Sequence, residues 1–138
     1  MSLHSARAGT RARLMPLARR YSLEELRAAA NEATAIQGRP IMIEYLMLRG
    51  VNDQPEDLEA LLGWIDGLPV HINLIPYNPI DTAGWLEGTG PEERSRFARA
   101  LREKGVKATL RYSLGADIAA ACGQLAGRES VSTAKGCT

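Results

Sequence analysis

Two hydrophobic periods alternate along the chain. From Ser22 onward, apolar residues recur every three or four positions, which is the spacing of an amphipathic helix. Ser22 and Glu25 form the S-x-x-E capping box that starts helices, and Gly38 has the composition of a helix end. The apolar positions of this segment are Leu23, Leu26, Ala30 and Ala33. The pattern predicts a helix from Ser22 to Gly38.

Residues 40–48 are almost continuously apolar and lie between Pro40 and Gly50. Such a run is typical of a strand that is covered on both faces. Residues 50–53 have turn composition, and two further apolar runs follow at 70–75 and 106–112. The chain therefore contains three predicted strands.

Helical patterns separate these strands. Residues 55–66 and 91–105 each begin with a proline followed by acidic residues, as helices do. Residues 5–21 form an arginine-rich connection, residues 76–90 a long loop, and residues 116–125 a short helix. The last residues, 128–138, are small and polar, and we expect them to be a disordered tail.

The order of helix and strand determines the expected fold class. Alternation with short connections implies an α/β fold with parallel strands and right-handed crossovers. Three or four such strands make a small open sheet, or half of a barrel. Ser2, Leu3 and His4 have the composition of a strand end, which favours a partial (β/α) barrel. We expect residues 1–127 to form one domain.

Composition narrows the class of protein. Apolar residues make up 45% of the chain and its net charge is +1, which fits a globular domain rather than a strongly basic nucleic-acid binder. No apolar run reaches 18 residues and no secretion signal is visible, so we expect a cytoplasmic protein without membrane contact. The first 23 residues nevertheless carry five arginines and no acid, which is either a solvated surface or a phosphate-binding cluster. These arginines are Arg7, Arg11, Arg13, Arg19 and Arg20.

Common signatures of phosphate loops, dinucleotide sites and zinc sites are absent, and no metal site is expected. Asn78 follows the second strand at its carboxyl end, where parallel α/β folds bind ligands, although asparagine before proline also makes ordinary turns. Glu44 is a carboxylate within an apolar strand and needs a partner, structural or functional. Cys122 has small neighbours that leave its sulfur accessible, but a lone buried thiol is the commoner case.

Six motifs in order resemble the radical S-adenosylmethionine (SAM) methyltransferases of the RlmN and Cfr type. The resemblance runs from Ser2 to about Gly127 and is nearer to RlmN, which methylates carbon-2 of an adenine. The matching segments are Ser2-Leu3-His4, Pro16 with Arg19-Arg20-Tyr21, residues 43–45, residues 50–53, residues 73–79 and residues 117–125.

The resemblance implies a set of roles. Ser2, Leu3, His4 and Asn78 would contact S-adenosylmethionine, and 23S ribosomal RNA and tRNA would be the substrates. Cys122 would accept a methyl group and deliver its carbon to the adenine. Carbon-2 of adenine is electrophilic, so the family takes this detour instead of a direct polar transfer.

The chain departs from the family in two ways. It has no C-x-x-x-C-x-x-C motif, and its two cysteines are too few for the three thiolates that hold the family's 4Fe-4S cluster. Cys137 lies outside every matching segment, and Leu114 replaces an arginine that the family usually has. We therefore expect the chain to be inactive alone.

Three readings follow besides an unrelated α/β binding protein, which the ordered motifs disfavour. In the first, the chain is the C-terminal part of such a methyltransferase. In the second, it is a subunit that is completed by a separate N-terminal chain, or by self-association through strand edges. In the third, it is a non-catalytic RNA-binding module that uses the arginine cluster.

Overall fold

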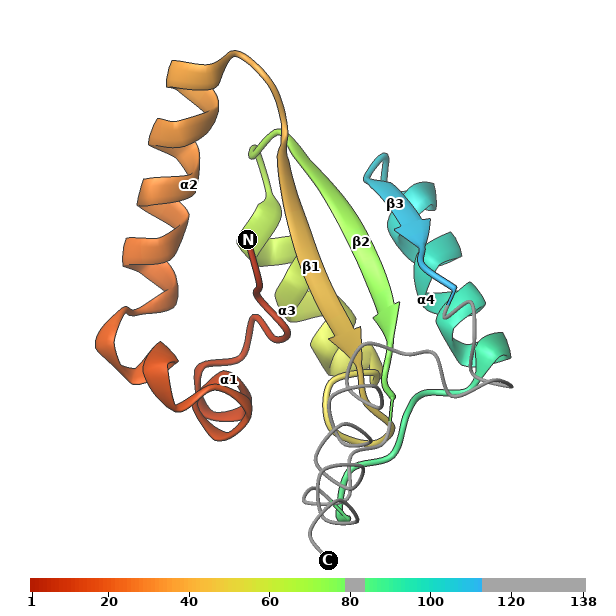
Figure 1. The fold of residues 1–138 in the computed structure, drawn as a ribbon. Coiled ribbons are helices and arrows are strands. Elements are labelled where there is room, and N and C mark those ends of the chain that lie inside the picture. Colours follow the sequence, from red (N-terminus) through yellow and green to blue (C-terminus); the bar gives the residue numbers. More distant parts are fainter. Residues whose placement is uncertain (79–83, 113–138) are drawn as a thin grey trace, which may run out of the picture.

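The computed structural model describes residues 1–78 and 84–112. Three parallel strands form its sheet in the order β1 (Ile41–Met47), β2 (Val70–Pro76) and β3 (Lys107–Leu110), as Figure 1 shows. The expected α/β class with parallel strands is confirmed, although β3 is shorter than the apolar run at 106–112 predicts. The predicted helix at 116–125 and the predicted tail lie outside the described residues.

The first residues of the chain extend this sheet on the free side of β1. The Leu3 amide donates to the Glu44 carbonyl at 3.0 Å, and the Glu44 amide donates to the Met1 carbonyl at 2.8 Å. Ser2 thus lies opposite Glu44 in a parallel bridge. The prediction of a strand end at Ser2–His4 is confirmed, and a segment at the start of the chain pairs with a strand more than 40 positions later.

A long helix precedes each strand: α2 (Leu23–Gln37) before β1, α3 (Pro55–Ile65) before β2 and α4 (Pro91–Glu103) before β3. At the start of α2 the Glu25 amide donates to the Ser22 hydroxyl and the Ser22 amide donates to the Glu25 carboxylate, so the predicted capping box is present. Gly38 ends this helix in the left-handed conformation, which glycine adopts without a side-chain clash. All three helices agree with their predicted ranges within two residues.

The arginine-rich connection expected at residues 5–21 contains two short helices. It folds into a short helix, α1 (Ala8–Leu14), and a 3₁₀ helix, η1 (Pro16–Arg20). The buried member of α1 is Arg11 rather than an apolar residue, so no hydrophobic period marks the helix in the sequence. Sequence periodicity fails here because a cation occupies the inward position.

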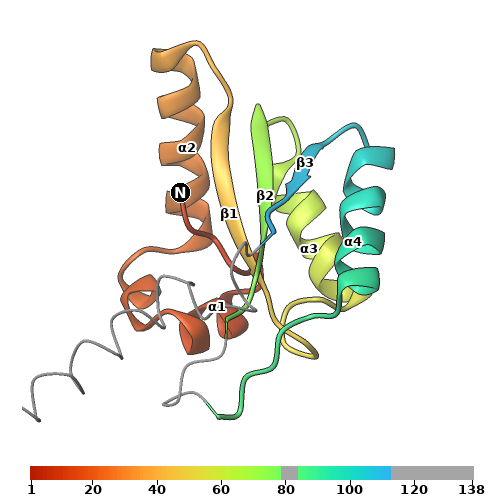
Figure 2. The same ribbon diagram turned by 45° about the vertical axis from the view of Figure 1, so that its right-hand side comes forward.

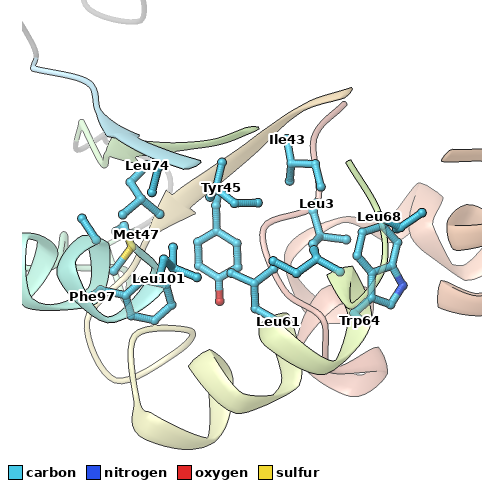
Figure 3. Packing of buried hydrophobic residues seen from close by; sticks show 14 of the residues in the cluster. Leu3, Ile43, Tyr45, Met47, Leu61, Trp64, Leu68, Leu74, Phe97 and Leu101 are labelled. Atoms are coloured by element: carbon cyan, nitrogen blue, oxygen red, sulfur yellow. The ribbon is translucent and has the colours of Figure 1, made fainter. Parts of the chain in front are cut away.

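The core lies on one face of the sheet, between the strands and the three long helices. Figure 2 shows α3 and α4 beside each other next to β2 and β3, while α2 runs along β1. The ring centroids of Tyr45 and Phe97 are 5.7 Å apart in the centre of this layer, which Figure 3 shows from close by. Its fully buried members are Leu3, Ile43, Tyr45, Met47, Leu61, Ile72, Leu74, Ala98 and Leu101.

The opposite face of the sheet is open within the described structure. Along β1, Met42 is 44% exposed and Glu44 is half-buried, whereas the alternate residues Ile43, Tyr45 and Met47 are completely buried. The prediction that both faces of this strand are covered is therefore wrong for the part of the chain that the structure describes. The long helices of residues 1–78 and 84–112 pack on the other side, and Leu46 on this face is only half-buried.

Candidate functional site at the carboxyl edge of the sheet

His4 lies at the carboxyl edge of the sheet, and its backbone is left-handed with φ 59°. Its Nδ1 accepts a hydrogen bond from the Leu46 amide at 3.0 Å, so the neutral ring carries its proton on Nε2. No hydrogen bond to Nε2 occurs within the described residues. Burial lowers the pKa of His4, Glu44 opposes that effect, and the Arg11 charge adds to it. His4 is therefore a neutral donor that is available to a ligand.

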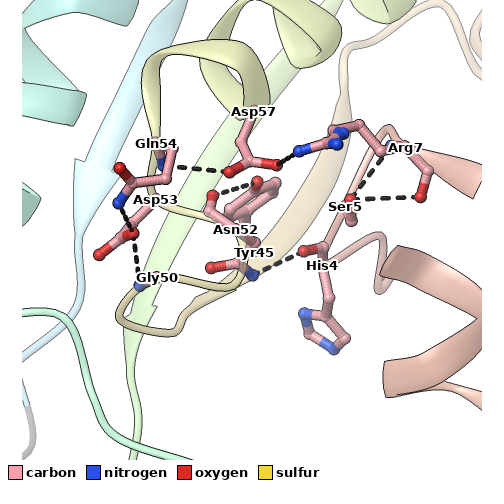
Figure 4. Close-up of polar contacts among 9 residues, drawn as sticks. All are labelled: His4, Ser5, Arg7, Tyr45, Gly50, Asn52, Asp53, Gln54 and Asp57. Atoms are coloured by element: carbon pink, nitrogen blue, oxygen red, sulfur yellow. Dashed lines mark hydrogen bonds and ion pairs between the residues drawn. The ribbon is translucent and has the colours of Figure 1, made fainter. Parts of the chain in front are cut away.

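Asn52 keeps His4 in this strained backbone conformation. Its side-chain amide donates to the carbonyls of His4 at 2.7 Å and Leu46 at 2.6 Å, while its Oδ1 accepts from the Leu48 amide at 2.8 Å. Figure 4 shows the Asn52 side chain turned toward the His4 carbonyl. Because Asn52 is fully buried, each of these bonds is protected from water. One side chain thus joins the start of the chain to the end of β1.

Two carboxylates hold the neighbouring loops. Asp53 accepts hydrogen bonds from the Gly50 amide and the Thr89 hydroxyl, both at 2.8 Å, and so connects the turn after β1 to the segment before α4. Asp57 is buried, caps α3 through the Gln54 amide, and forms an ion pair with Arg7 at 3.3 Å (Figure 4). These contacts join the edge around His4 to α3 and to the segment before α4.

Asn78 and Tyr77 reach the same edge from β2. Met47 of β1 lies opposite Pro76, the last residue of β2. Tyr77 and Asn78 therefore come directly after the carboxyl end of β2. Asn78 is half-buried, and the buried Tyr77 hydroxyl has no hydrogen-bond partner among residues 1–78 and 84–112. A buried hydroxyl without a partner is unusual and indicates a polar group that a ligand or water satisfies.

The remaining predicted cofactor residues differ in what they offer. The Leu3 side chain is fully buried in the core, so only its backbone is left for a ligand. The Ser2 hydroxyl donates to the Glu44 carboxylate at 3.5 Å, which gives that carboxylate a partner within the strand layer. The edge therefore brings one imidazole and one half-buried asparagine together with the first residues of the chain, and such polar groups suit a polar organic ligand.

The five arginines do not form one free cationic patch. Arg7 is engaged with Asp57, and Arg13 stacks on the exposed Trp85 ring at 5.8 Å from its centroid. Arg11 is buried, whereas Arg19 and Arg20 are exposed. Sequence composition grouped cations whose surroundings in the fold are unlike one another.

The chain does not supply a site for the family's iron–sulfur cluster. Within the described residues no three histidine, cysteine or carboxylate side chains come together as metal ligands. The full sequence holds two cysteines, one fewer than the three thiolates that such a cluster takes. Cys122 and Cys137 both lie outside the described residues, as does Leu114.

The other end of the sheet has a cavity of about 770 Å³. It lies between the amino ends of the strands and the ends of the helices, and Pro40, Pro69 and Lys104 are among its lining residues. Ligands of parallel α/β folds bind at the carboxyl ends of strands, so this position does not favour a catalytic role.

Two residues of this edge had no functional assignment from the sequence. The turn at residues 50–53 was identified, but the reach of Asn52 back to His4 depends on residues 48 positions apart. The missing partner of Tyr77 is visible only in three dimensions. Their position within segments that match family motifs was the one available signal.

Among residues 1–78 and 84–112, no helix is long and apolar enough to cross a membrane. A comparison with models of protein families finds no match.

Comparison with curated and solved proteins gives clear relatives. The chain is 48% identical over 130 residues to a probable RNA methyltransferase of Rhodopirellula baltica, with 94% of this chain and 34% of that protein covered. It is 45% identical over 126 residues to the dual-specificity RNA methyltransferase RlmN of Anaeromyxobacter dehalogenans, with 91% and 34% covered. The chain thus spans about a third of the length of these relatives.

Solved structures agree with these relatives. A radical SAM methyltransferase from Sphaerobacter thermophilus superposes with a TM-score of 0.82 at 43% identity, over 89% of this chain and 36% of that one. A domain of pyruvate-formate lyase-activating enzyme from Bacteroides vulgatus, at 22% identity and a TM-score of 0.61, shares the fold alone. The chain is therefore a homologue of the RlmN-type radical SAM RNA methyltransferases and corresponds to their C-terminal part.

Proposed function

We propose that this chain provides the S-adenosylmethionine-facing edge of a cytosolic adenine-C2 RNA methyltransferase and is inactive without the cluster-binding part. The observation that supports this most is that His4 and Asn78 both lie at the carboxyl edge of one parallel sheet, with His4 held by the Leu46 amide. Both residues were expected at the cofactor from sequence motifs that are 74 positions apart.

The residues have separate tasks in this proposal. The Ser2–His4 backbone, the His4 imidazole and the Asn78 side chain hold the cofactor. S-adenosylmethionine supplies the methyl group, and Cys122 carries the transferred carbon to an adenine of 23S ribosomal RNA or tRNA. Asn52 positions His4, since it holds the backbone carbonyl of that residue.

The missing cluster ligands require that another part of a protein complete the enzyme. Within the described residues, β3 pairs with β2 alone, and residues 1–3 pair with β1 alone, so each side of the sheet has an edge that can accept another strand. This observation favours a second candidate, a subunit that a separate N-terminal chain completes.

Isothermal titration with S-adenosylmethionine tests the cofactor edge. Loss of one hydrogen bond to a charged ligand costs about 1.5–3 kcal/mol, so we expect Asn78→Ala and His4→Ala each to weaken binding about 10- to 100-fold. Asn31→Ala is the matched control, because Asn31 is exposed on α2. Unchanged affinity in both edge variants, with normal folding, would overturn the assignment.

Iron analysis and a cofactor-cleavage assay test the inactivity. We expect no bound cluster and no cleavage of S-adenosylmethionine by this chain alone. A reconstituted cluster with turnover would contradict the proposal. Co-purification with a chain that carries C-x-x-x-C-x-x-C would favour the subunit, and a monomer with no such partner would count against it.

A further inference from the structure

A cavity of about 430 Å³ lies where α1, η1 and the start of α2 meet. It is distinct from the edge around His4 and Asn78, since neither residue lines it. Its polar lining residues are Arg11, Arg19, Arg20, Tyr21, Ser22 and Glu25. Three of the chain's N-terminal arginines therefore converge on one hollow.

Arg11 is the unusual member of this lining. Its side chain is 7% exposed, its Nε is buried without a hydrogen-bond partner, and no ion pair to it occurs within the described residues. A buried guanidinium without a counter-charge is costly, and burial lowers its pKa accordingly. By contrast Arg7 pairs with Asp57 and Arg13 stacks on Trp85. Among the arginines that the structure describes, Arg11 is the one that is buried and lacks a partner for its charge.

The charges around Arg11 favour an anion. Arg11, Arg19 and Arg20 face one carboxylate, that of Glu25, which is already bound by the Ser22 amide at 2.8 Å. The cavity also lies against the first turn of α2, where the helix dipole favours negative charge. Guanidinium groups bind phosphate oxygens through paired N–H donors, so the donor set fits a phosphate.

We propose that this cavity binds a backbone phosphate of the RNA substrate, with Arg11 as the buried anchor and Arg19 and Arg20 at its exposed rim. The inference rests on the proposed function for its RNA, but it does not depend on the cofactor edge. Tyr21 is 64% exposed beside the cavity, and its ring offers a stacking surface to a neighbouring base.

Fluorescence anisotropy with a short single-stranded RNA, repeated over a series of salt concentrations, tests the phosphate site. We expect Arg11→Met and Arg20→Gln each to weaken binding about tenfold and to reduce the salt slope by about 0.7, the value for one lost contact with a single strand. Arg13→Gln is the matched control, because Arg13 lies outside the cavity, and its affinity should stay within about twofold.

A loss of RNA binding in these variants can be distinguished from a failure to fold. Replacement of an unpaired buried charge by an apolar side chain of similar size is often neutral or stabilising, so Arg11→Met should unfold at the wild-type urea concentration or above it. Arg20 is exposed, and its replacement leaves the fold untouched. Both variants should also keep wild-type affinity for S-adenosylmethionine, which separates this site from the cofactor edge.

Inorganic phosphate gives an independent readout through His4. The Arg11 charge lowers the pKa of His4, so phosphate bound at Arg11 should raise it, and NMR titration of the His4 ring should show this shift in the wild type but not in Arg11→Met. RNA affinity and salt slope that are unchanged in both Arg11→Met and Arg20→Gln would overturn the proposal. Phosphate binding that RNA does not compete with would also overturn it, because the cavity would then bind a free phosphate or nucleotide.

Discussion

The two faces of the sheet are built from the same strands, yet they differ in almost every property. On the covered face, Tyr45 of β1 and Leu74 of β2 are fully buried against helices. On the open face, the positions one residue earlier are Glu44 and Asn73, which are half-buried and polar. The period of two along a strand separates a stabilising surface from one with chemical groups.

The open face has an order of its own. Ser2, Glu44, Asn73 and Thr109 stand at one level across neighbouring strands. The Ser2 hydroxyl donates to the Glu44 carboxylate, and the Thr109 hydroxyl donates to the Asn73 side chain at 3.3 Å. In a barrel this face lines the interior. The apolar half of each strand therefore holds the fold, while the polar half faces whatever the barrel encloses.

Two methionines of β1 give the strongest test of the difference between the two faces. Met47 is 0% exposed on the covered face, and Met42 is 44% exposed on the open face. We expect Met47→Ala to lower the free energy of unfolding by about 2–5 kcal/mol because it leaves a cavity, and Met42→Ala to lower it by less than about 1 kcal/mol. Urea denaturation measures both. Equal losses in the two variants would show that the open face is buried in solution.

Asn52 shows that a polar side chain on the covered side can matter as much as an apolar one. Asn52→Ala leaves the Leu48 amide and the carbonyls of His4 and Leu46 without their partner, so we expect a loss of about 2–3 kcal/mol in urea denaturation. The His4 ring signals in NMR should shift as well, since its backbone is released. Asn31→Ala, on the exposed side of α2, should change neither quantity.

His4 gives the smallest expected effect and connects the edge to pH. Its pKa in the folded protein lies below the ordinary value of 6.5, so the unfolded chain takes up the proton first as the pH falls. The stability that neutral His4 contributes is present above about pH 6.5 and declines below it. The test compares the single variant His71→Gln, in which His4 is the remaining histidine, with the double variant His4→Gln/His71→Gln. Urea denaturation at several pH values should show the decline in the single variant and a shallower decline in the double variant. Identical pH profiles would remove His4 as the cause.

Local patterns predicted much of this fold. The capping box of Ser22 and Glu25 and the prolines at positions 55 and 91 gave helix starts that the structure confirms, because these signals act within one turn of helix. The parallel direction of the strands was predicted from the alternation of helices and strands alone. Such features depend on residues close together in the chain.

Features that depend on distant residues could not be predicted. The apolar composition of β1 suggested burial on both faces, but burial is decided by where the helices pack. The arginine cluster appeared uniform in sequence, yet Asp57 and Trp85 neutralise or cover two of its members from 50 or more positions away. At the candidate site, the motifs predicted His4 and Asn78, whereas the support from Asn52 required the fold.

The pairing of the first residues with β1 has a consequence for the order in which the molecule folds. Ser2 and Glu44 are 42 positions apart, whereas α4 and β3, which pack on each other, are consecutive elements of the chain. Closing a long segment costs more chain entropy than closing a short one, so the contacts of Leu3 and His4 form after the contacts between α4 and β3. In hydrogen exchange the Leu3 amide should therefore be less protected than the amides of α4. The edge that presents His4 depends on long-range pairing, so it exists only in molecules whose sheet has formed.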